Sequence, residues 1–128
     1  MSYYFSKSID GPFDAAVERV KAELKKEGFG VLTEIDVRKT LKEKLGAEFR
    51  NYRILGTCNP PNAYKALLAE DKIGLMLPCN VIVQELADGR VEAAAIDPVA
   101  SMAAVGNPAL EPVGREVRAK LKTIIEGL

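Results

Sequence analysis

The sequence predicts an α+β fold: a two-layer sandwich in which a mainly antiparallel sheet carries helices on one face. Three observations lead to this class. Strand-like and helix-like segments alternate along the chain, two neighbouring strands are separated only by a short Asp-Gly turn, and a long amphipathic helix lies near each end. The chain has 128 residues, which suits one domain, so we expect residues 1–128 to share one core.

The N-terminal segment predicts a strand followed by a long helix. Apolar and polar side chains alternate over residues 3–9, which is typical of a half-buried strand. Apolar residues then recur at helical spacing, at Phe13, Val17, Val20 and Leu24. We expect Gly28 to end this helix, because glycine readily adopts the left-handed backbone found after a helix C-terminus.

The next segments predict two further strands, each followed by a short helix. Residues 29–35 favour a strand, and Asp36 is a suitable N-cap for the helix after it. The apolar positions of this helix, which we expect to face inward, are Val37, Leu41 and Leu45. Residues 49–57 predict a strand, and Pro60 suits the first position of another short helix.

The longest apolar-rich run, residues 73–86, predicts the central strand. Its β-branched residues favour extended backbone. Counting in twos places five side chains on the core-facing side: Leu75, Leu77, Cys79, Val81 and Val83. Pro78 has no backbone N–H to donate to a neighbouring strand, so we expect it at an edge or a bulge.

A hairpin is expected to join this strand to residues 91–97. If Asp88 and Gly89 are the two residues of the turn, the register of the pair follows by counting back from them. That register sets Val81 opposite Ile96, Asn80 opposite Asp97, and Glu85 opposite Glu92. The last pair is unfavourable, because like charges lie directly across from each other.

The C-terminal segment predicts a second long amphipathic helix, and Pro112 indicates that its regular part starts near Glu111. Its apolar stripe is formed by Leu110, Val113, Val117, Leu121, Ile124 and Leu128. The two long helices can cover one face of the sheet. An apolar second face would need another cover, so we expect a homodimer.

The composition excludes several classes of partner and reaction. Lys and Arg number 18, as do Asp and Glu, so no net charge attracts nucleic acid or an anionic membrane. No segment approaches the apolar length of a membrane span, and the N-terminus lacks a secretory apolar core, which predicts a cytoplasmic protein. Histidine is absent, which excludes Ser-His-Asp and Cys-His catalysis and zinc sites that contain histidine. We expect no metal and no cofactor.

Several segments, taken together, resemble the domain of unknown function 302 family of small bacterial and archaeal proteins. The resemblance extends from Phe13 to the C-terminal helix and is carried by residues 29–36, 41–46, 52–60, 74–81 and 96–98. It includes the motifs Cys58-Asn-Pro60 and Leu77-Pro-Cys-Asn80. The resemblance implies a fold like half of the TATA-binding protein, usually dimeric, with no established activity. It does not imply DNA binding, because function resides in sites and this chain has no basic surface signal.

The candidate site gathers the two Cys-Asn pairs and a nearby carboxylate, at Cys58, Asn59, Cys79, Asn80 and Asp97. The expected hairpin register brings Asp97 beside Asn80. A helix beginning just after Cys58 is expected to lower the pKa of that thiol, because its free N–H groups stabilise negative charge. We therefore predict a pocket for a small molecule near these residues.

Other interpretations of the same residues stay open. Cys58 suits a thiol-dependent redox or sulfur-handling enzyme, whereas a purely structural interaction module needs no reactive group. Both cysteines also fit the core as small hydrophobic residues. Asn59 suits a helix cap, and Asp97 suits the turn before a proline. A set of two thiolates with a thioether from Met76 or Met102 suits Cu(I) better than zinc, but methionines at such positions usually fill core gaps.

Overall fold

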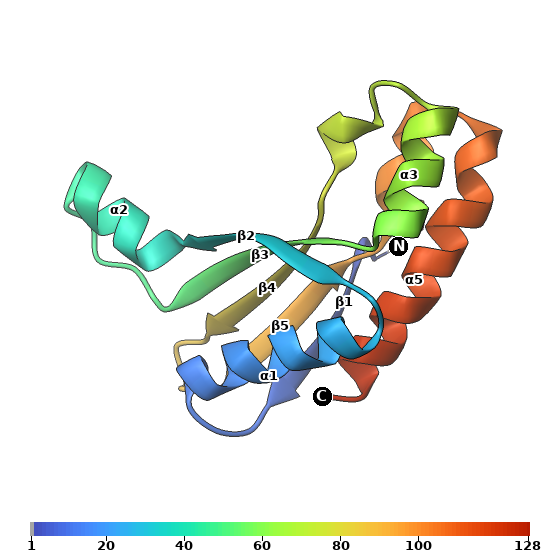
Figure 1. Ribbon diagram of the computed structural model, residues 1–128. Helices are drawn as coiled ribbons and strands as arrows, with labels where there is room; N and C mark the ends of the chain where they lie inside the picture. Colours follow the sequence, from blue (N-terminus) through green and yellow to red (C-terminus); the bar gives the residue numbers. More distant parts are fainter. Residues whose placement is uncertain (1) are drawn as a thin grey trace.

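The structure is a computed structural model that describes residues 2–128, and its centre is one five-stranded sheet (Figure 1). The strands are β1 (Tyr4–Ile9), β2 (Gly30–Asp36), β3 (Tyr52–Cys58), β4 (Cys79–Glu85) and β5 (Val91–Ile96). Their order across the sheet is β1-β5-β4-β3-β2, and every neighbouring pair is antiparallel. The predicted α+β class is therefore confirmed. The implied similarity to half of the TATA-binding protein stays a prediction.

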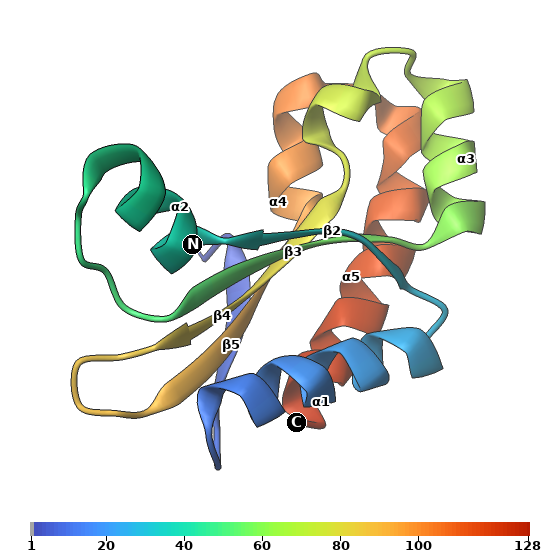
Figure 2. The same cartoon turned by 60° about the vertical axis from the view of Figure 1, so that its left-hand side comes forward.

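The helices fall into two groups around this sheet. They are α1 (Phe13–Lys26), α2 (Val37–Leu45), α3 (Pro60–Ala69), α4 (Pro98–Met102) and α5 (Glu111–Glu126), with short 3-10 turns η1 (Ile73–Met76), η2 (Ala103–Val105) and η3 (Pro108–Leu110). The helices α1 and α5 lie across one face of the sheet, while α3 and α4 flank the first half of α5 beyond the sheet's end (Figures 1 and 2). Within residues 2–128, no helix is long and apolar enough to cross a membrane.

The core lies between the sheet and α1 and α5, as the apolar patterns predict. All four predicted positions of α1 are buried, and β4 contributes Cys79, Val81 and Val83. Leu55, in the middle of β3, is completely buried opposite Val81. The helix α5 begins at Glu111, as expected from Pro112.

The second face of the sheet, which we call the open face, lies opposite α1 and α5 and is apolar along its middle. One row of paired residues crosses four strands: Ile35 lies opposite Ile54, Ile54 opposite Ile82, and Ile82 opposite Ala94. These side chains are half-buried or exposed in the single chain, with Ile35 at 46% exposure. The open face therefore presents a continuous apolar strip.

The expected hairpin register is wrong by one residue. Leu86 and Arg90 pair across the loop, with Leu86 N donating to Arg90 O at 2.7 Å, so three residues connect the strands. Gly89, with φ of 87°, supplies the left-handed backbone that a three-residue loop needs. Val81 consequently lies opposite Ala95 and Gln84 opposite Glu92. The like-charge pair is avoided, because Gln84 Nε2 donates to Glu92 Oε1 at 3.0 Å.

Two other expectations differ from the structure. The run 73–86 is not one strand. Residues 73–76 form η1, where Leu75 is 86% exposed, and Pro78 precedes the central strand β4 instead of lying at an edge or bulge.

The helix α2 has no buried residue, and Leu45 is 75% exposed. Figures 1 and 2 show why: α2 projects past the end of the sheet, away from α1 and α5. Asp36 does cap it, accepting from Lys39 N at 3.0 Å.

Candidate functional site

Three of the five predicted site residues line one small cavity, which we call the thiol cavity. Cys58 ends β3, Cys79 begins the neighbouring strand β4, and Asn59 links β3 to α3. The cavity has a volume of about 20 Å³, and Met102 from the end of α4 also lines it. The antiparallel pairing of β3 with β4 explains this placement, because the end of one strand meets the start of the other.

The first turn of α3 adds a polar wall to the thiol cavity. Asn59 is the N-cap of α3, and its Oδ1 accepts from Asn62 N at 3.4 Å and from Asn62 Nδ2 at 2.9 Å. Its Nδ2 donates to Gly28 O at 3.4 Å, which joins the cap to the loop after α1. Asn62 is only 3% exposed, and within residues 2–128 its Oδ1 has no hydrogen-bond partner. Asn62 also lines the cavity, and its buried Oδ1 is an unsatisfied acceptor.

Both thiols favour the protonated form. Burial raises the pKa of Cys58, and burial with the nearby Cys58 raises the pKa of Cys79 to about 11. The expected lowering of the Cys58 pKa by the start of α3 is wrong, because burial raises this pKa. Neither cysteine is a preformed thiolate nucleophile at neutral pH.

The other two predicted residues lie away from the thiol cavity. Asn80 follows Cys79 in β4, so its side chain points to the open face, where it is exposed and borders a hollow of about 400 Å³. Asp97 caps α4, accepting from Val99 N at 3.0 Å and from Arg118 Nε at 3.1 Å. The structure therefore does not pair Asn80 with Asp97.

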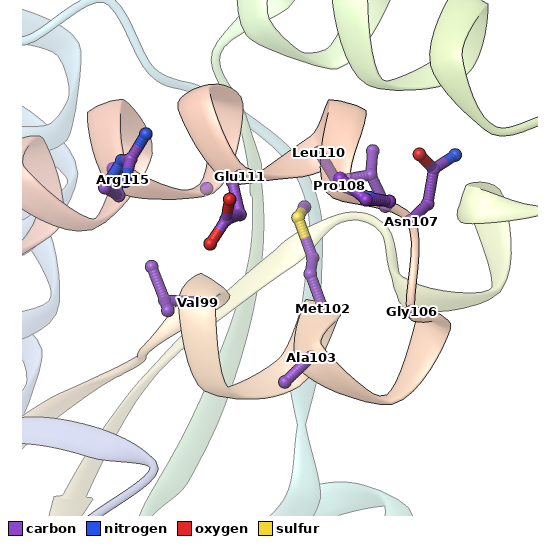
Figure 3. A pocket seen from close by; sticks show the side chains of 10 residues that line it. Val99, Met102, Ala103, Gly106, Asn107, Pro108, Leu110, Glu111 and Arg115 are labelled. Carbon is purple, nitrogen blue, oxygen red and sulfur yellow. The ribbon is translucent and has the colours of Figure 1, made fainter.

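A larger cavity, the interhelical cleft, lies between α4 with η2 and the start of α5 (Figure 3). Its volume is about 580 Å³. Apolar side chains including Val99, Met102 and Leu110 form most of its wall, and Asn107, Glu111 and Arg115 add polar groups. In Figure 3 the Met102 side chain rises from the α4 segment toward α5. Met102 lines both the interhelical cleft and the thiol cavity, so the two spaces share this residue.

The interhelical cleft was missed from the sequence, although one signal was present. Gly114 interrupts the otherwise helical pattern of α5, although glycine destabilises a helix relative to alanine. A Cβ at this position would lie 3.7 Å from Val99 Cγ2 and 3.8 Å from Met102 Sδ. The glycine therefore marks where α4 approaches α5.

Among residues 2–128 no group of three His, Cys, Asp or Glu side chains is placed to hold a metal ion. A zinc site of the ordinary kind is therefore not formed by these residues, since such sites use four donors from this set. Both cysteines are free.

Comparisons with known proteins agree on one family. The family model described as "Domain of unknown function DUF302" matches residues 5–128. A crystal structure of an uncharacterized conserved DUF302 protein from Bacillus stearothermophilus superimposes with a TM-score of 0.91 and 27% sequence identity, covering 98% of each chain. No curated protein matches this sequence. Both the sequence motifs and the fold therefore place this chain in the DUF302 family of domains of unknown function.

Proposed function

We propose that the protein binds a small molecule in the interhelical cleft, beside the two thiols. The observation that carries this proposal is the cleft itself, whose volume of about 580 Å³ falls within the range of ligand pockets, about 300–1,000 Å³. Its wall is mainly apolar with a few polar groups, which is the usual composition of such pockets. The site differs from the predicted one in its residues, but it borders the thiol cavity through Met102.

The polar groups of the cleft define the class of ligand. Glu111 and Arg115 bring both signs of charge to its wall. Asn107 is already engaged, because its Nδ2 donates to Ala69 O at 2.9 Å and its Oδ1 accepts from Ala109 N at 3.0 Å. A largely apolar molecule with one or two polar ends fits this set.

Filling the cleft is expected to abolish ligand binding. Ala103 lines the cleft, so Ala103→Phe places a ring in it. Titration with anilinonaphthalene sulfonate, an apolar anionic dye, is expected to give a saturable fluorescence rise with the wild type and little rise with Ala103→Phe. Native mass spectrometry of the purified protein would show a non-covalent adduct that the variant lacks.

The neighbouring alanine provides the matched control. Ala104 is exposed in η2 and does not line the cleft, so Ala104→Phe adds the same ring outside the pocket. This variant is expected to bind the dye like the wild type. Equal binding by both variants and the wild type would place the dye elsewhere and contradict the proposal.

The thiol-enzyme alternative is less favoured, because burial raises the pKa of Cys58 and the chain has no histidine to act as its base. The two free thiols instead support a reducing compartment, so we propose a cytoplasmic location.

The open face favours a second activity, self-association. We propose that two copies form a symmetric homodimer through this face. The row from Ile35 to Ala94 is a contiguous apolar strip, and a symmetric dimer can bury the same strip on both copies at once. The exposed Leu45 of the projecting α2 adds apolar surface available to a partner copy. A second copy would also close the hollow of about 400 Å³ beside Asn80.

A charge in the middle of this strip is expected to separate the dimer. Ile82 lies at the centre of the row, and Ile82→Glu would bury an unpaired carboxylate in the interface. Light scattering after size-exclusion chromatography is expected to give a dimer mass for the wild type and a monomer mass for Ile82→Glu.

The outer side of α3 is the competing apolar surface, since Tyr64, Leu67 and Leu68 are exposed there. Leu68→Glu is therefore the matched control, and it is expected to remain dimeric. A monomeric Leu68→Glu with a dimeric Ile82→Glu would move the interface to α3.

A further inference from the structure

The strand pairing arranges the open face in rows that cross the sheet, with β4 as the middle strand of the five. Alternate residues of each strand point to this face, because successive side chains of a strand point to opposite sides. From β2 to β1, the middle row consists of Ile35, Ile54, Ile82, Ala94 and Ser6. Large side chains therefore lie on the β3 side of β4, and small ones lie on the β5 side.

The next row carries opposite charges on the two sides of β4. Gln84 of β4 lies between Tyr52 of β3 and Glu92 of β5. Gln84 Oε1 accepts from Arg50 Nε at 2.9 Å, and Gln84 Nε2 donates to Glu92 Oε1 at 3.0 Å. These hydrogen bonds hold a positive charge on the β3 side and a negative charge on the β5 side. Among residues 2–128, neither Arg50 nor Glu92 forms a salt bridge.

The hollow of about 400 Å³ on the open face follows the same asymmetry. Residues of β4, β5 and β1, including Ile82, Ala94 and Tyr4, form most of its lining, whereas neither Ile35 nor Ile54 takes part. The hollow therefore lies mainly on the side of the sheet that carries the small side chains. Large side chains of a second copy can fill it.

We propose that the two copies of the homodimer stack their open faces about a two-fold axis parallel to β4, an inference that rests on the homodimer proposed above. This axis lays β3 of one copy over β5 of the other and keeps each row over the same row. Ile54 then lies over Ala94 of the partner subunit, and Arg50 faces Glu92 of the partner subunit. A two-fold axis repeats every contact, so the dimer gains two such charge pairs and fills both hollows.

The same rows disfavour the other way of stacking the two faces. An axis along the middle row would lay each strand over the same strand of the partner subunit. Ile54 would then meet Ile54 of the partner subunit, and the hollows would face each other unfilled. Glu92 would face Ile96 of the partner subunit, since both residues lie two positions from Ala94 in β5. A buried carboxylate without a partner is costly, so the charges favour the axis parallel to β4.

Mixing two charge variants tests this arrangement. Arg50→Glu makes both facing positions acidic and Glu92→Arg makes both basic, so each variant alone is expected to lose the dimer mass in light scattering. In an equal mixture every contact joins an acidic position to a basic one. We expect native mass spectrometry to show dimers with one copy of each variant. An effect within one chain cannot be rescued by mixing, because each chain keeps its own two like charges beside Gln84.

An exposed arginine on the opposite side of the sheet provides the matched control. Arg19 lies on α1, so Arg19→Glu makes the same change of charge away from the open face and is expected to keep the dimer mass. Circular dichroism of all variants is expected to match the wild type. The double variant Arg50→Glu with Glu92→Arg restores opposite charges at the facing positions and is expected to be a dimer.

The outcomes separate this arrangement from the homodimer itself. A monomeric wild type would overturn both. If Ile82→Glu separates the dimer but neither charge variant does, the open-face dimer stands and the axis parallel to β4 is wrong. Folded charge variants that remain monomeric after mixing would also overturn this axis.

Discussion

Leu55→Ala is expected to lower the free energy of unfolding by about 2–5 kcal/mol, the range for removing a large aliphatic side chain from a packed core. Leu55 is completely buried in β3 and lies between Glu34 of β2 and Val81 of β4. Neighbours held by strand pairing on both sides can move little to refill the space, so most of the cavity remains. Urea unfolding at one fixed protein concentration measures the change, because dimerisation would make the midpoint depend on concentration.

The same substitution at an exposed leucine is the control. Leu75 in η1 is 86% exposed, so Leu75→Ala is expected to change the free energy of unfolding by less than about 0.5 kcal/mol. Similar losses for the two variants would contradict the placement of the core between the sheet and the long helices.

The elements of the fold could be predicted where the apolar pattern has a clear period. The stripe of α1 and the alternation of β4 are each long enough to fix both the type of element and its buried face. For α2 the apolar pattern correctly predicted a helix, but the expectation that its apolar side faces the core was wrong. A stripe shows which side of a helix is apolar, not what covers it, and α2 projects past the sheet with Leu45 exposed.

The hairpin shows a limit of turn chemistry. An Asp-Gly pair suits a two-residue turn, but glycine also suits the last position of a three-residue loop. Gly89 takes the second role here, and the whole register shifts by one residue. In the run 73–86, apolar composition alone did not separate a strand from the 3-10 turn η1, because short apolar segments carry little periodic information.

The candidate site could be predicted in part for a similar reason. Cys58 and Cys79 both line the thiol cavity because they lie at the adjoining ends of the neighbouring strands β3 and β4. Asn80 could not follow Cys79 into the same cavity, since successive side chains of a strand point to opposite faces. The lining of this cavity by Asn62 and Met102 depends on how α3 and α4 pack against α5, and no local pattern encodes that packing.

Alkaline pH is expected to remove the stability that depends on the protonated Cys79 thiol. Burial raises the pKa of this thiol from 9.0 to about 11, so between these values the folded chain keeps a proton that the unfolded chain releases. The resulting stabilisation is fully present below pH 9 and is lost as the pH rises through about 11. The difference between the two pKa values corresponds to about 3 kcal/mol.

A variant without this thiol isolates the effect from the titration of lysines and tyrosines. Cys79→Ala is expected to be less stable than the wild type at pH 8, because it loses a buried side chain. As the pH rises from about 8 to 11, the difference in free energy of unfolding between the wild type and Cys79→Ala should shrink by most of the 3 kcal/mol. The difference between the wild type and Cys58→Ala should change less, because Cys58 is the more exposed thiol. Urea unfolding of the three proteins across this range measures both differences. If the difference in free energy of unfolding between the wild type and Cys79→Ala stays constant with pH, Cys79 ionises as easily in the folded chain as in the unfolded one. The thiol cavity then admits water freely.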